Sequence, residues 1–99
     1  MSWYEFDNGS TIGERGIEGG KIVKDEKFDN SARITFEKLS DGHYAITCGV
    51  YGAFFHTAWS EEANALSKYE QMKSDLEVIL SQENYDKHYR LIEEFADKY

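Results

Sequence analysis

The sequence predicts an α+β fold, in which an antiparallel sheet of about four or five strands (residues 3–59) packs against one or two C-terminal helices (residues 60–98). Two observations lead to this prediction. Residues 32–38 and 43–50 alternate apolar and polar side chains, as half-buried antiparallel strands do. The C-terminal third instead repeats apolar residues at helical spacing. A chain of 99 residues has one core, so we expect a single domain over residues 1–99.

The N-terminal part predicts short strands separated by loops. Residues 3–6 and 21–24 form two short strand candidates. Between them, residues 8–20 hold five of the eight glycines and predict a flexible loop or a loose hairpin, with residues 9–20 as the most mobile internal segment. Residues 25–30, DEKFDN, predict a polar turn.

The register of the hairpin between residues 32–38 and 43–50 follows from its loop. A two-residue turn would bring the apolar Phe36 opposite Thr47 and mix the two faces of the sheet, which the period of two forbids. A three-residue loop over residues 40–42 pairs Phe36 with Ile46 and puts a glycine at the left-handed position of the turn. We therefore expect the three-residue loop.

The next strand, residues 54–59, allows two registers. An even loop places Cys48 opposite Phe55 and buries Phe55 and Trp59 on the core face. An odd loop places Cys48 opposite His56 and exposes those aromatic residues. Burying a large apolar side chain contributes about 1.5–3 kcal/mol, whereas burying a histidine without a partner costs free energy, so we expect the even register.

The C-terminal third predicts two helices. Ser60 is the expected N-cap of the first, and a break near residues 81–84 separates it from the second, which Asn84 caps. The apolar stripe of the first helix consists of Leu66, Tyr69, Met72, Leu76, Ile79 and Leu80. The stripe of the second, which is out of phase with the first, consists of Tyr85, Tyr89, Ile92, Phe95, Ala96 and Tyr99.

Composition excludes several classes of partner. The net charge of −8 disfavours nucleic acid, which requires a basic surface. Neither a signal peptide nor an apolar run of membrane-spanning length is visible. A single cysteine cannot form an internal disulfide and suits a reducing compartment, so we expect a cytoplasmic protein.

No motif for catalysis, cofactor binding or metal binding is visible. The alternative reactive pair is Cys48 with His56, but the even register would put their side chains on opposite faces and leave Cys48 in the core. The run GGK at 19–21 lacks the hydroxyl residue and the upstream glycine of a P-loop. The histidines at 43, 56 and 88 lack the spacing of metal ligands.

Five runs in the first two-thirds of the chain, STIGERG, GG, DE, ARIT and AITCGVYG, resemble a small family of uncharacterised bacterial proteins. This resemblance implies no functional residue. In size, acidity and aromatic content the chain is also similar to immunity proteins that neutralise basic toxins.

These observations favour a non-enzymatic, acidic protein-binding module of regulatory or immunity-like type. Seven tyrosines exceed the needs of a small core, and tyrosine is common at interface hot spots. We expect the last helix to join a dimer or a foreign partner, with Tyr89 and Phe95 as anchors. The candidate interface residues are Tyr85, Tyr89, Phe95 and Tyr99. The alternative is a small enzyme or ligand-binding domain with a pocket near the glycine-rich loop and Cys48/His56.

Overall fold

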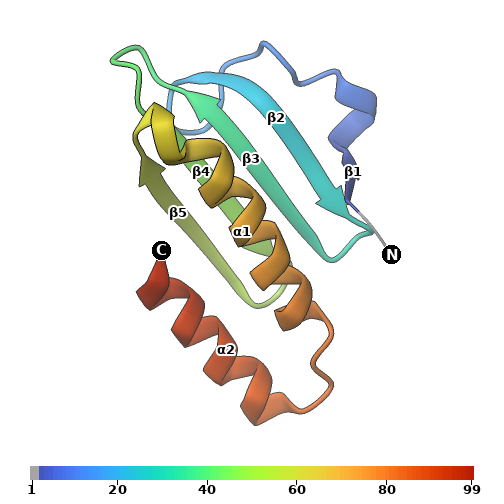
Figure 1. The fold of residues 1–99 in the computed structure, drawn as a ribbon. Coiled ribbons are helices and arrows are strands. Elements are labelled where there is room, and N and C mark those ends of the chain that lie inside the picture. The colour runs from blue at the N-terminus through green and yellow to red at the C-terminus, as the bar shows by residue number, and fades with distance from the viewer. Residues whose placement is uncertain (1–2) are drawn as a thin grey trace.

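The computed structural model describes residues 3–99, apart from the side chain of Tyr85, and has the predicted α+β fold (Figure 1). Its strands are neighbours in chain order, and every pairing is antiparallel. The elements in this range are β1 (Trp3–Glu5), the 3-10 turn η1 (Phe6–Gly9), β2 (Lys21–Phe28), β3 (Ala32–Lys38), β4 (Tyr44–Val50), β5 (Phe54–Ser60), α1 (Glu62–Leu80) and α2 (Tyr85–Lys98).

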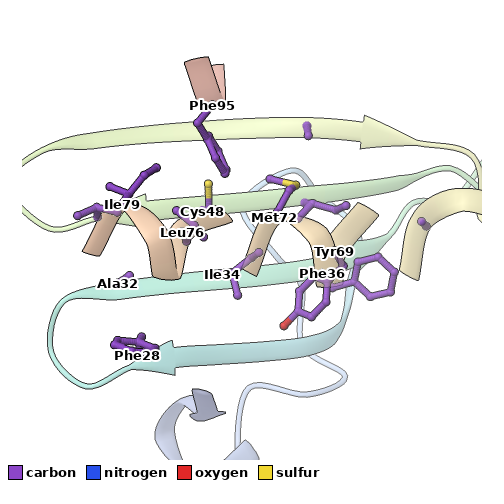
Figure 2. Packing of buried hydrophobic residues seen from close by; sticks show 14 residues of the cluster. Phe28, Ala32, Ile34, Phe36, Cys48, Tyr69, Met72, Leu76, Ile79 and Phe95 are labelled. Carbon is purple, nitrogen blue, oxygen red and sulfur yellow. The ribbon is translucent and has the colours of Figure 1, made fainter. Parts of the chain in front are cut away.

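The core lies between one face of the sheet, here called the inner face, and the two helices. Helix α1 runs across this face, and α2 lies beside it on the β5 side (Figure 1). The inner-face strand residues meet a stripe on α1, of which Tyr69, Met72 and Leu76 are completely buried (Figure 2). The apolar stripe of α1 and the inner face of the sheet are therefore buried against each other, and this packing stabilises both elements.

The hairpin between β3 and β4 has the predicted three-residue loop. Phe36 pairs with Ile46, and the N–H of Leu39 donates to the carbonyl of His43 at 2.8 Å. Gly42 closes the loop with φ of +90°, a conformation that glycine adopts at little cost.

The polar turn predicted over residues 25–30 is wrong, because β2 continues to Phe28. The charged residues in this stretch have partners on both faces of the sheet. Asp25 bonds to Arg33 on one face, and Glu26 accepts from the hydroxyl of Tyr69 on the other. The chain turns only after Phe28, where Asp29 takes a positive φ of 49°.

The even register predicted between β4 and β5 is also wrong. Cys48 pairs with His56, and Phe55 and Trp59 lie on the opposite, outer face with 65% and 53% of their surface exposed. The prediction did not consider that a helix could contribute a large apolar side chain to the inner face of this strand. The ring of Phe95, from α2, lies 5.5 Å from that of Phe54 and 6.0 Å from that of His56, so α2 fills the inner face of β5 (Figure 2).

The two helices are separated where the sequence predicts. The side chain of Asn84 caps α2 by accepting from the N–H of Lys87 at 3.0 Å. Ser60 is not the N-cap of α1, because it ends β5, and Glu61 takes the cap position without a side-chain bond. The predicted stripe residue Leu66 is 52% exposed, and its neighbour Ala65 is buried instead.

Helix α2 is part of the core. Phe95 is 3% exposed, and the ring of Tyr99 lies 4.8 Å from it. The hydroxyl of Tyr99 donates to Asp75 of α1. Phe95 is therefore buried within the single chain, whereas Tyr89 is 52% exposed and Tyr85 has its side chain outside the described part of the structure. The role of these residues at an interface stays a prediction.

Truncating Phe95 should therefore affect folding rather than association. We expect Phe95→Ala to lower the free energy of unfolding by about 3–5 kcal/mol, because it leaves a cavity between α2 and the sheet. Leu66→Ala, on the exposed side of α1, is the control and should change it by less than about 0.5 kcal/mol. Urea denaturation followed by circular dichroism measures both. Equal stability of the two variants would contradict this placement of α2.

Candidate functional site

The outer face of the sheet is divided into a covered half and an open half. Residues 6–20 fold back over β2 and β3, and the Arg15–Lys21 bridge joins the end of this segment to the sheet. Over β5 the outer face is open at Phe55 and Trp59, whereas Ala45 and Thr47 on the outer face of β4 are buried. The candidate site lies where the two halves meet.

A buried ion pair holds the covering segment to the sheet. Both oxygens of Asp25, which is 1% exposed, accept from Arg33, at 2.9 and 2.6 Å. Thr11, from the covering segment, donates to the same carboxylate at 2.8 Å, and the ring of Phe6 stacks under the Arg33 guanidinium at 3.7 Å. The hydrogen bonds to Asp25 raise the pKa of Arg33, so the guanidinium stays charged.

A second buried carboxylate fixes the glycine-rich loop. Glu37 is completely buried and accepts from the backbone N–H groups of Glu18 at 3.2 Å and Gly20 at 3.0 Å. A Cβ atom at Gly16 would collide with the Glu37 carboxyl group. The backbone can therefore come this close to Glu37 only because residue 16 is glycine. Residues 8–20 were predicted as a flexible loop or a loose hairpin, and the antiparallel Arg15–Lys21 bridge corresponds to the loose hairpin. The mobility of this segment stays a prediction.

The open half of the outer face carries no charged side chain. We call it the uncharged patch, and it consists of Ala45, Thr47, Gly49, Phe55, Thr57 and Trp59. Phe55 lies opposite Gly49, and Thr47 and Thr57 share a hydrogen bond at 3.3 Å. Ala45 and Thr47 are buried, and the exposed surface of the patch comes mainly from Phe55 and Trp59. In a chain with 30% charged residues, an uncharged face with two exposed aromatic side chains is unusual.

A groove of about 610 Å³ runs between the covering segment and the uncharged patch. Arg15 and Ile17 form one wall, Thr35 and Thr47 the floor, and Tyr51 and Phe55 the other wall. Ile17 is 70% exposed and Tyr51 57%, so the rim offers apolar surface to a ligand. The volume lies within the range of binding pockets, which is roughly 300–1,000 Å³.

The alternative reactive pair is brought together but is not activated. Cys48 and His56 are directly opposite each other on the inner face, yet among the described residues Nε2 of His56 is buried without a hydrogen-bond partner. Burial raises the pKa of the Cys48 thiol to about 12, so it remains protonated at neutral pH. The arrangement therefore lacks the thiolate that nucleophilic catalysis requires.

The other predicted absences concern metals and membranes. Across residues 3–99, no group of three or more His, Cys, Asp and Glu side chains could hold a metal ion. His43 contacts Asp41 in the loop after β3, while Nδ1 of His88 lies 3.2 Å from the carbonyl of Ile79. Within the same described range, neither helix has the length and apolarity to cross a membrane.

A pocket near the glycine-rich loop was predicted only as the alternative, and the sequence holds a further signal for the groove. Residues 42–60 contain no Asp, Glu, Lys or Arg, even though they form two strands of which only one face can enter the core. A charge-free stretch of this kind places uncharged side chains on the outer face as well. The pocket near the glycine-rich loop that the sequence offered as an alternative lies on this outer face. Cys48, which is 1% exposed, is among its lining residues, whereas His56 is not.

Comparison with protein-family models, with curated proteins and with solved structures finds no match to this chain. The function must therefore be argued from the groove and its surroundings.

The buried thiol gives a direct test of the inner-face assignment. We expect Cys48 in the folded protein to react with a thiol reagent at neutral pH at least tenfold more slowly than a free cysteine peptide, because a raised pKa and burial both reduce the available thiolate. Labelling followed by mass spectrometry measures the rate. Labelling faster than the peptide would contradict the assignment and restore the enzyme hypothesis.

The Glu37 contact predicts how the covering loop can be loosened. Glu37→Gln replaces one carboxylate oxygen by an N–H₂ group that faces a backbone donor, so we expect the free energy of unfolding to fall by about 1–3 kcal/mol. Amide exchange at Glu18 and Gly20 should accelerate. Glu62→Gln, at an exposed position on α1, is the matched control and should alter neither quantity. Unchanged exchange at Gly20 would show that the carboxylate does not hold the loop.

Proposed function

We propose that this protein is a non-enzymatic binding module, regulatory or immunity-like in type, that uses its groove and uncharged patch to bind apolar side chains of another protein. The observation that carries the proposal is the exposure of Phe55 and Trp59 on a sheet face without charges. Soluble proteins seldom leave two large aromatic residues on one open face unless a partner covers them. Aromatic residues of this kind also dominate binding energies at interfaces.

The surroundings of the patch have the layout of a protein interface. Its centre is uncharged, with Phe55 and Trp59 on either side of the Thr47–Thr57 pair, and its margin carries charged groups, among them Glu14 and Arg15 of the covering segment. The net charge of −8 would draw a basic partner toward this surface and raise the association rate. The single buried cysteine is consistent with a cytoplasmic setting.

A small-molecule ligand is the second candidate, and the groove volume of about 610 Å³ favours it. The two candidates differ in how far the contact extends. A small ligand would occupy the groove and leave Trp59, which does not line it, uncovered. A protein partner would cover both Phe55 and Trp59.

Paired substitutions test the proposal. We expect Phe55→Ser and Trp59→Ser each to weaken binding of the partner at least tenfold, because each removes a large apolar contact at the centre of the interface. The wild-type chain isolates the partner from source cells, and calorimetry with the purified partner then measures the affinity of each variant.

Leu66→Ser and Val78→Ser are the matched controls, since these side chains are 52% and 49% exposed on α1, away from the outer face. They should bind as the wild type does. Loss of binding in Phe55→Ser with full binding in Trp59→Ser would favour the small ligand. Wild-type affinity in both outer-face variants would contradict the proposed site.

A further inference from the structure

The two edges of the sheet differ in a way that bears on the partner. The edge strand β1 has only three residues and ends in a turn, and the indole of Trp3 bonds to Glu77 of α1. The other edge strand, β5, has seven residues with the sequence FFHTAWS and no charge. Proteins usually protect an edge with charges, prolines or short strands, and the sequence of β5 itself contains neither a charged residue nor a proline.

The hydrogen-bond alternation shows which backbone groups face this edge. Two backbone hydrogen bonds flank the β3–β4 ladder: the N–H of Leu39 donates to the carbonyl of His43, and the N–H of Tyr51 donates to the carbonyl of Ser31. The odd-numbered residues of β4 therefore direct their backbone N–H and C=O groups toward β3. The even-numbered residues of β4 then bond to β5, at positions 54, 56, 58 and 60. The N–H and C=O groups of Phe55 and Thr57 therefore point outward, and Lys68 covers the carbonyl of Trp59 at 3.0 Å.

Helix α2 packs against α1 and against the inner side of β5. Lys98 and Tyr99 both bond to Asp75 of α1, and in the view of Figure 1 α2 lies on the far side of β5 from α1. Phe95 belongs to the buried cluster of the inner face (Figure 2), and its ring lies against those of Phe54 and His56. A strand added beside β5 would lie about 4.8 Å away in the plane of the sheet, below the helix layer, which stacks at about 10 Å.

From this arrangement we propose that β5 binds an extended segment of the partner protein as a sixth strand of the sheet. The inference rests on the proposed function and specifies its partner. Only a polypeptide in extended conformation can supply donors and acceptors at the spacing of Phe55 and Thr57. Its side chains on the outer side would lie against Phe55 and Trp59, so they should be apolar. Basic residues beside the segment would complement the net charge of −8.

A second copy of this chain fits the edge less well. Antiparallel pairing of two β5 strands would relate the copies by a two-fold axis perpendicular to the sheet, which puts both α2 helices on the same face beside the junction. Each α2 already lies beyond its own β5 (Figure 1), and packed helices need 8–10 Å between axes, about twice the strand spacing. The two helices would overlap, so we assign the edge to a foreign segment.

Thr57→Pro is the variant that tests the edge. It removes the outward N–H while leaving the ladder to β4, and proline is tolerated on edge strands in this orientation. Thr57→Val is the matched control, because it loses the same hydroxyl bond to Thr47 but keeps the N–H. Thermal melts of both variants establish that they are folded. The probes are random 12-residue peptides displayed on phage and selected on the wild-type chain.

We expect selected peptides to alternate apolar residues and to bind Thr57→Pro at least tenfold more weakly than Thr57→Val, which lacks the same hydroxyl but keeps the N–H. Bound peptide should slow amide exchange at Phe55 and Thr57. Peptides that bind both Thr57 variants equally but lose affinity for Phe55→Ser would overturn the edge and leave the proposed function standing. Peptides indifferent to all three substitutions would overturn both. Failure to enrich any peptide, or a wild-type dimer that Thr57→Pro dissociates, would also overturn the inference.

Discussion

The pairing of Cys48 with His56 is the constraint on which the rest of the structure depends. In a strand, a shift of one residue exchanges the two faces, so this register decides at once what enters the core and what faces solvent. It sends the thiol and the imidazole inward and Phe55 outward. The same choice therefore removes the candidate reactive pair from solvent and creates the exposed aromatic surface.

The sequence predicted the parts of the fold that local patterns control. The β3–β4 register followed from the alternation of Phe36 and Ile46 with a glycine at the third loop position, and Asn84 marked the helix break. It could not predict the β4–β5 register, because residues 42–60 carry no charge and both faces of β5 look apolar. The decisive contact comes from Phe95, which lies far along the chain and fills the inner face of β5. For the same reason the pocket that was predicted as an alternative was not assigned to the outer face beside Phe55.

The wall of the groove depends on buried carboxylates rather than on apolar contacts. Asp25 and Glu37 are both buried on the outer face, one bonded to Arg33 and Thr11, the other to the backbone of the glycine-rich loop. Buried ion pairs contribute little net stability, because desolvation offsets their attraction. What they provide here is position, since each carboxylate fixes one point of the covering segment relative to β3. A purely apolar contact is not directional, so it would hold the covering segment on the sheet without fixing its position.

The exposed aromatic side chains of the patch and the open backbone edge belong to one strand, β5. The side chains of β5 that face outward present Phe55 and Trp59, and its backbone presents the edge groups of Phe55 and Thr57. Either feature alone would be a weak indication, since single exposed aromatics and open edges are common. Their coincidence on seven uncharged residues means that one added strand would satisfy the backbone and cover the aromatic side chains in the same step. With α2 packed on its inner face through Phe95, β5 is already an ordered strand of the sheet, so an extended segment of the partner would supply most of the conformational entropy lost on binding.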